Sequence, residues 1–144
     1  MNNPAMPESR PRYDDLLRVL VVDADDRVRE SLTGLIAIGG RCTVVASAGY
    51  PGEALDLAMD YRPDVVIIDP RLPEVDSGIA LIARLRSQLP TVRILAMSWS
   101  DSLEAAVIES GADGFVRKTF RPNELVSAVL AASRTVDLPA SESA

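Results

Sequence analysis

The chain has 144 residues, the size of one ordinary domain, of which 47% are hydrophobic and 25% charged. It contains one cysteine and no histidine, which excludes an internal disulfide, a Ser-His-Asp triad, a Cys-His dyad and a histidine-based metal helix. Acidic residues outnumber basic ones by 21 to 15, giving a net charge of −6. Direct binding of nucleic acid by this chain is therefore not expected, and the remaining chemistry is that of carboxylates.

Both ends of the chain are polar and contain proline. Residues 1–17 lack the apolar stretch of a signal peptide and are predicted to form a flexible leader, followed by one domain over 18–134. Residues 135–144 are predicted to be a tail or the start of a linker. The longest apolar runs, Val19–Val22 and Val65–Ile68, are far shorter than the roughly 20 residues of a membrane span. We therefore expect a cytoplasmic protein without membrane contact.

Five short apolar runs recur along the chain at intervals of roughly 25 residues. They are mostly continuous and rich in β-branched residues, which is typical of strands buried on both faces of a parallel sheet. The predicted strands are Val19–Val22, Val44–Ala46, Val65–Ile68, Ile94–Met97 and Phe115–Val116.

A segment with helical spacing follows each predicted strand. The first helix carries an apolar stripe over Val28–Ile36 and is ended by Gly39-Gly40. The second begins at Pro51, because the first turn of a helix accepts proline. The third carries its stripe over Ile82–Leu89 and is ended by Pro90.

Helix signals also bound the last two predicted helices. Asp101 and Glu104 have the spacing of a capping box at the start of the fourth helix, and Gly111 closes that helix. Pro122 opens the fifth. A strand followed by a helix, repeated five times, predicts a doubly wound α/β domain. In such domains the active crevice lies beyond the carboxyl ends of the strands.

Polar residues stand at the ends of four of the five predicted strands: Asp23, Asp69, Ser98 and Lys118. Two carboxylates held close together repel each other unless a cation neutralises them, and Mg²⁺ is bound by such carboxylates together with water. A carboxylate beside such a metal can attack phosphorus and form an acyl phosphate. The plainer interpretation of a strand-end aspartate is a helix N-cap, and we expect Asp25 or Asp26 to cap the first helix.

With these residues the sequence resembles the receiver domain of bacterial two-component response regulators over about residues 18–134. Asp69-Pro-Arg-Leu-Pro73 is similar to the family's Asp-x-x-(Met/Leu)-Pro loop, and Gly111-Ala-Asp-Gly-Phe-Val-Arg-Lys118 to its Gly-Ala-x-Gly-aromatic-x-x-Lys stretch. The resemblance implies a flavodoxin-like (βα)5 three-layer sandwich with parallel sheet order 2-1-3-4-5. It also implies a phosphoprotein that accepts a phosphoryl group rather than an enzyme.

The resemblance assigns roles to the strand-end residues. Asp69 would take the phosphoryl group from a histidine kinase or a phosphotransfer protein. Asp23, Asp69 and the backbone carbonyl of Arg71 would bind Mg²⁺, while Ser98 and Lys118 would contact the phosphoryl oxygens.

The resemblance also implies a way of passing the signal on. Ser98 and Phe115 would be the switch pair, and their movement would alter the face formed by the helix from Asp101, the strand at 115–116 and the helix from Pro122. That face would contact a downstream partner, a fused output domain or a second copy of the chain. Whether the sequence is a complete single-domain regulator or part of a longer protein is left open.

Three positions depart from the family pattern. Ala24 replaces the second acid of the metal site, which predicts weakened Mg²⁺ binding, since the side chain of Asp25 is expected to point elsewhere. Thr119 follows Lys118 where many receivers have proline; the subgroup with LuxR/NarL-type output domains often lacks that proline too. The stretch Glu74–Gly78 is one residue longer than the usual loop.

Other functions remain as alternatives. A pseudo-receiver that binds partners without phosphorylation is favoured by Ala24. A haloacid-dehalogenase-like phosphatase is suggested by Asp23-Ala-Asp25, although Arg27 stands where that motif has Thr or Val. A flavodoxin-type cofactor site is disfavoured, because the first strand–helix turn carries acids instead of a phosphate cradle.

Overall fold

The computed structural model of the chain describes residues 15–119 and 121–134. Most of the predicted leader and all of the predicted tail lie outside the described residues. The strands are β1 (Leu17–Val22), β2 (Cys42–Ala48), β3 (Val65–Ile68), β4 (Arg93–Ser98) and β5 (Gly114–Arg117). The helices are α1 (Asp26–Ala37), α2 (Pro51–Tyr61), α3 (Val75–Gln88), α4 (Glu104–Ser110) and α5 (Pro122–Arg134), with a 3₁₀ turn, η3 (Asp101–Leu103), before α4.

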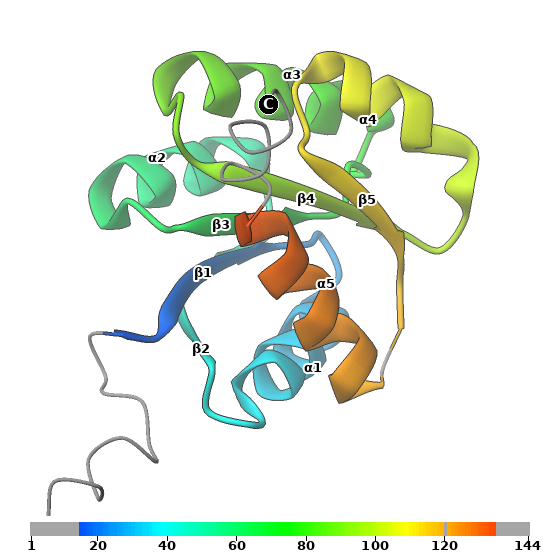
Figure 1. Cartoon of the computed structure of the whole chain (residues 1–144). Coiled ribbons are helices and arrows are strands. Elements are labelled where there is room, and N and C mark those ends of the chain that lie inside the picture. Colours follow the sequence, from blue (N-terminus) through cyan, green and yellow to red (C-terminus); the bar gives the residue numbers. More distant parts are fainter. Residues whose placement is uncertain (1–14, 120, 135–144) are drawn as a thin grey trace, which may run out of the picture.

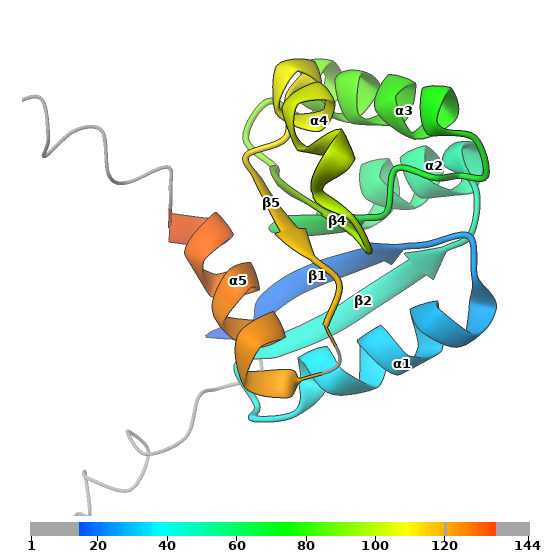
Figure 2. The same ribbon diagram turned by 90° about the vertical axis from the view of Figure 1, so that its right-hand side faces the viewer.

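The five strands form one parallel sheet in the order β2-β1-β3-β4-β5. Helices α2, α3 and α4 cover one face of the sheet, and α1 and α5 cover the other (Figures 1 and 2). This confirms the predicted doubly wound, flavodoxin-like three-layer sandwich and its strand order. Within the described part of the chain, every helix is too short or too polar to cross a membrane.

The central strands are apolar along their whole length because both of their faces are covered. Val65–Ile68 are all at most 1% exposed, as are Val19–Val22. Alternate residues of each strand enter two separate cores: Val66 and Ile68 pack towards α2–α4, and Val65 and Ile67 towards α1 and α5. Each of the five predicted strands lies within an observed one, and Val65–Ile68 coincides with β3.

Helix boundaries follow the predicted signals at most positions. Asp25 caps α1, with its Oδ1 accepting from the backbone N–H groups of Arg27 and Val28 at 2.9 and 3.2 Å, and Gly111 ends α4 with a φ of 124°. The predicted capping box at Asp101 is wrong. The Ser100 side chain accepts from the Ser102 N–H and caps η3, so Asp101 lies inside the 3₁₀ turn and α4 begins only at Glu104.

Charged side chains tie together the amino ends of β4 and β5. The Asp113 carboxylate accepts from Arg86 Nη2 at 2.6 Å, from Arg93 Nη2, and from the backbone N–H of Ile94 at 2.8 Å. Arg86 also donates to three backbone carbonyls, those of Pro90, Val92 and Gly111. This network anchors α3 and both strands at the edge of the sheet opposite to their carboxyl ends.

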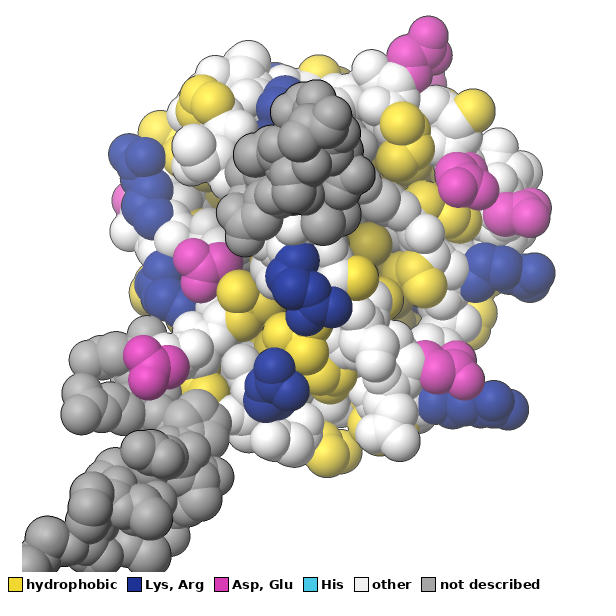
Figure 3. Space-filling view, viewed as in Figure 1, with side chains coloured by type: hydrophobic (Ala, Val, Ile, Leu, Met, Phe, Trp, Pro, Cys, Tyr) yellow, Lys and Arg dark blue, Asp and Glu magenta, His cyan; other side chains and the backbone are white. Residues whose placement is uncertain are grey.

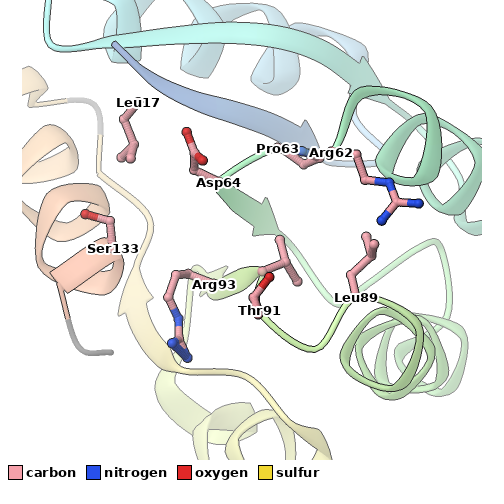
Figure 4. A pocket seen from close by; sticks show the side chains of 9 residues that line it. Leu17, Arg62, Pro63, Asp64, Leu89, Thr91, Arg93 and Ser133 are labelled. Carbon is pink, nitrogen blue, oxygen red and sulfur yellow. The ribbon is translucent and has the colours of Figure 1, made fainter. Parts of the chain in front are cut away.

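A cavity of about 380 Å³ opens at the same amino edge of the sheet. Asp64 and Arg93 reach it from the starts of β3 and β4, and Ser133 from the end of α5 (Figure 4). It is therefore separate from the strand ends that carry the predicted site residues.

Gly78 allows α3 to approach the loop after β3. A Cβ atom at this position would overlap the carbonyl oxygen of Pro70, which directly follows Asp69. Backbone atoms cannot move aside as a flexible side chain can. Glu74 occupies the N-cap position of α3, and its carbonyl accepts from the Gly78 N–H; the extra residue in this stretch stays a prediction.

We predict that Gly78→Ala lowers the free energy of unfolding by about 1–3 kcal/mol, because it overpacks a backbone contact. Gly34→Ala in α1 is the matched control, since a Cβ there meets nothing within 4 Å and alanine favours a helix by about 0.5–1 kcal/mol. Urea unfolding of both variants measures the two changes. Equal effects of the two substitutions would contradict the role of the Pro70 contact.

Candidate functional site

The sheet brings the predicted strand-end residues to one edge. Asp23 follows β1 and Asp69 follows the neighbouring β3, and their backbone N–H groups continue the strand hydrogen bonding to Ala48 and Val22 at 3.1 and 3.0 Å. Ser98 ends β4, and the N–H of Lys118 donates to its carbonyl at 2.8 Å. All four residues predicted from the strand ends therefore lie at the carboxyl edge, as expected for parallel strands.

One ammonium group joins the two carboxylates. Lys118 Nζ lies 2.7 Å from Asp23 Oδ2 and 2.6 Å from Asp69 Oδ2. The three side chains are only 3%, 4% and 9% exposed, respectively. Charged groups this deeply buried are found only where they are paired. The cluster is therefore held by its own internal ion pairs.

Backbone N–H groups hold the second oxygen of each carboxylate. Asp23 Oδ1 accepts from the N–H of Asp25, and Asp69 Oδ1 from the N–H of Arg71, both at 2.9 Å. In both cases the donor lies two residues further along the chain, which is the Asx-turn pattern. Each aspartate is thus oriented by the turn that follows its strand and presents its remaining oxygen to Lys118.

The carboxylates keep Lys118 protonated. Burial by itself would lower the pKa of the Lys118 ammonium, but hydrogen bonds and charge from Asp23 and Asp69 outweigh burial and raise the pKa above its ordinary value of 10.5. A permanently charged ammonium in this position can compensate negative charge that arrives at Asp69.

The predicted switch residues occupy neighbouring strands. Ser98 is 2% exposed, next to the ion cluster, and Phe115 is partly buried against the core beneath α2–α4. Their strands are paired, with Ala96 opposite Phe115 and Ser98 opposite Arg117. Ser98 thus lies at the carboxyl edge of the sheet and Phe115 on the adjacent strand, three residues before Lys118; their role as a switch pair remains a prediction.

Among the residues that the structure describes, two acids, Asp23 and Asp69, meet at the site. Ala24 is exposed, the Asp25 carboxylate caps α1, and Asp26 pairs with Arg29 at 2.6 Å. The described residues accordingly contain no cluster of three acidic, histidine or cysteine side chains that would suit a metal. The Asp25 side chain is engaged at the start of α1 rather than at the ion cluster, as expected.

The remaining donors still fit Mg²⁺. This ion is commonly bound through one or two carboxylates, with water filling the other positions. Asp23 and Asp69 are close enough for a single cation, Lys118 Nζ, to bridge them. The participation of the Arg71 carbonyl stays a prediction.

Sequence reasoning missed two residues that surround the cluster. Arg29 Nη1 donates to the carbonyl of Asp23 at 2.6 Å and so supports the β1–α1 turn. The Trp99 ring lies over Lys118 Nζ, with 5.2 Å between the nitrogen and the ring centroid. The position of Trp99 directly after Ser98 was visible in the sequence, but the direction of its ring was not.

The link after Lys118 is an ordinary trans peptide. Leu72–Pro73 is the one cis peptide bond in residues 15–119 and 121–134, so Thr119 takes the place of the family's proline without a cis bond before it.

Comparison with known families agrees with this geometry. The sequence family described as the response regulator receiver domain matches residues 19–130 of the chain. The chain is 37% identical over 120 residues to the response regulator MprA of Mycobacterium sp. (strain KMS), covering 82% of this chain and 51% of that protein. It is 32% identical over 117 residues to the transcriptional regulatory protein LnrK of Bacillus subtilis, covering 80% and 53%. The chain thus spans about half the length of these curated relatives.

Solved structures show the same fold. The signal receiver domain of NarL from Mycobacterium tuberculosis superposes with a TM-score of 0.77 at 30% identity, covering 84% of this chain and 98% of that one. A LuxR-family response regulator from Aurantimonas sp. SI85-9A1 gives a TM-score of 0.75 at 33% identity, covering 82% and 85%. Together with the site at the carboxyl edge of the sheet, these matches show that the chain belongs to the response regulator receiver domain family of two-component systems.

Proposed function

We propose that this chain accepts a phosphoryl group on Asp69 from a histidine kinase or a phosphotransfer protein. The observation that carries the proposal is the position of the Asp69 carboxylate. It lies at the end of a central strand, is oriented by the Arg71 N–H, and has Lys118 Nζ 2.6 Å from its Oδ2. The chain has no histidine, so these 144 residues contain no phosphohistidine that could serve as the donor.

The transfer is a displacement at phosphorus. A carboxylate oxygen of Asp69 attacks the phosphorus of the donor's phosphohistidine, the phosphorus–nitrogen bond breaks, and the imidazole nitrogen keeps the electron pair of that bond. The aspartate becomes an acyl phosphate. Lys118 compensates the added negative charge, and the Ser98 hydroxyl is the neighbouring hydrogen-bond donor for a phosphoryl oxygen.

Asp23, Asp69 and the Arg71 carbonyl would hold Mg²⁺ during this reaction. When bound, the ion would supply positive charge to the phosphoryl oxygens. Because Lys118 bridges both carboxylates in this structure, metal binding has to compete with an ion pair already formed. With Ala24 in place of an acid, we propose a weaker Mg²⁺ site than the family pattern provides.

The face of α4, β5 and α5 is the proposed route to a partner. Ser98 and Phe115 lie on β4 and β5 beneath it, and a hollow of about 260 Å³ between β5 and α5 is lined mainly by small and apolar residues. Figure 3 shows apolar side chains between charged ones on the side of the molecule that carries α5 and β5. A downstream protein, a fused output domain or a second copy would contact this face.

The cytoplasmic location of the protein stays a prediction.

A second candidate, a pseudo-receiver that binds partners without phosphate, is favoured by one observation. Lys118 neutralises part of the carboxylate charge without a metal, so the site is held together in the unphosphorylated form. The phosphatase alternative has less support, because the Asp25 side chain caps α1 instead of facing Asp23 as a general acid.

We expect phosphoramidate with Mg²⁺ to add one phosphoryl group to the protein, because Asp69 is the oriented carboxylate beside Lys118. Intact-protein mass spectrometry measures the gain. Asp69→Asn should abolish it. Asp60→Asn, which alters an exposed acid on α2, is the matched control and should behave like the wild type. If no donor phosphorylates the wild type, the pseudo-receiver is the better description; a gain that persists in Asp69→Asn would place the acceptor elsewhere.

We also predict that Ala24→Asp tightens Mg²⁺ binding by about tenfold or more. Mutation of a group that supports a metal site commonly changes the metal affinity by a factor of this size. Without metal the new carboxylate adds repulsion beside Asp23 and should lower the melting temperature, and Mg²⁺ should restore it by binding the folded state. Ala83→Asp, on the exposed side of α3, adds the same charge as a control. Equal Mg²⁺ affinity in the wild type and Ala24→Asp would show that position 24 does not limit metal binding.

A further inference from the structure

The pairing of β4 with β5 places Trp99 beside Lys118. Ser98 is opposite Arg117 in the parallel register, so the next residue of each strand, Trp99 and Lys118, leaves the sheet at the same point. The Arg117 guanidinium donates to the Trp99 carbonyl at 3.1 Å, and the Lys118 N–H donates to the Ser98 carbonyl. Two hydrogen bonds therefore fix the backbone on which the ring stands.

The ring of Trp99 lies over the ammonium that bridges the two carboxylates. Lys118 Nζ is 5.2 Å from the ring centroid, within the range of a cation–π interaction, and tryptophan has the most favourable ring for it. Trp99 is 54% exposed, whereas the Lys118 side chain is 3% exposed. An exposed aromatic ring thus covers a buried ammonium, an arrangement that simple core packing does not require.

We propose that Trp99 is a positioning residue that holds the Lys118 ammonium between Asp23 and Asp69. The inference rests on the proposed function, because it concerns the same carboxylates. Its consequence is that Trp99 sets how strongly the lysine competes with a divalent cation. Any interaction that stabilises Lys118 in its bridging position lowers the affinity of the Asp23 and Asp69 Oδ2 atoms for Mg²⁺.

Two substitutions separate the electronic role of the ring from its bulk. Trp99→Phe keeps an aromatic face, whereas Trp99→Leu keeps an apolar side chain without one. Tyr61→Leu is the matched control, because Tyr61 is an exposed aromatic residue, 45% exposed, at the end of α2. Trp99 is itself half exposed, so we expect all three variants to fold, which circular dichroism and urea unfolding verify.

Lys118 gives a direct readout, because it is the only lysine in the chain. Protein labelled with ¹³C,¹⁵N-lysine therefore shows a single lysine side chain by NMR. In metal-free wild type we expect the Hε protons to be shifted upfield by the ring above them. The shift should largely persist in Trp99→Phe and Tyr61→Leu and disappear in Trp99→Leu.

Titration with Mg²⁺ alone, followed on the same lysine signals, measures the competition. We expect Trp99→Leu to bind Mg²⁺ about two- to fivefold more tightly than wild type, the factor that corresponds to an exposed cation–π pair. Trp99→Phe should lie closer to the wild type, and Tyr61→Leu should equal it.

Three results would overturn the proposal. They are lysine protons without a ring shift in the wild type, equal Mg²⁺ affinity in the wild type and Trp99→Leu, and equal effects of Trp99→Phe and Trp99→Leu.

The phosphorylation assay is independent of these measurements. Loss of phosphoryl transfer with an intact ring shift and a tighter Trp99→Leu would refute the proposed function and support the role of Trp99. If the wild type binds no Mg²⁺, the competition, and with it the proposal, fails even where phosphoramidate still labels Asp69.

Discussion

Two carboxylates buried at one edge of a sheet repel each other, and in this structure a single ammonium compensates them. The strand order makes this possible, because β1 and β3 are neighbours and carry Asp23 and Asp69 side by side. Lys118 comes from β5, at the edge of the sheet, and its side chain reaches across β4 to both acids. Removing one member of such a buried cluster leaves an uncompensated charge, which commonly costs about 3–5 kcal/mol. The ion pairs of Lys118 with Asp23 and Asp69 therefore both stabilise the fold and arrange the site.

The alanine at position 24 alters the charge balance of this cluster. Two ionised carboxylates and one ammonium leave one negative charge, whereas a third acid would leave two. A divalent cation therefore has less charge to neutralise here than in a receiver with the full acidic set. Membership of the receiver family is established by sequence and fold, whereas the proposed weakening of Mg²⁺ binding concerns a single position in the acidic set.

The fold and the four strand-end residues were predictable because they depend on local patterns. Continuous β-branched runs mark buried parallel strands, and such strands end at a common edge. Contacts between side chains far apart in the chain were not predictable in this way. Asp113 pairs with Arg86 and Arg93, which lie 27 and 20 residues away. The ring of Trp99 meets Lys118 only through the register of β4 and β5. Ser100 and Asp101 are both good capping residues, so sequence alone could not choose between them.

The two edges of the sheet carry different kinds of contact. At the amino edge, β4 and β5 are tied to each other and to α3 by charged hydrogen bonds through Asp113 and Arg86. At the carboxyl edge, β4 ends in Ser98 and β5 leads into Lys118, the cation of the ion cluster, whose charge balance changes if a ligand arrives. If negative charge arriving at Asp69 displaces Lys118, the anchored amino ends of β4 and β5 would confine that displacement to the carboxyl edge of the sheet.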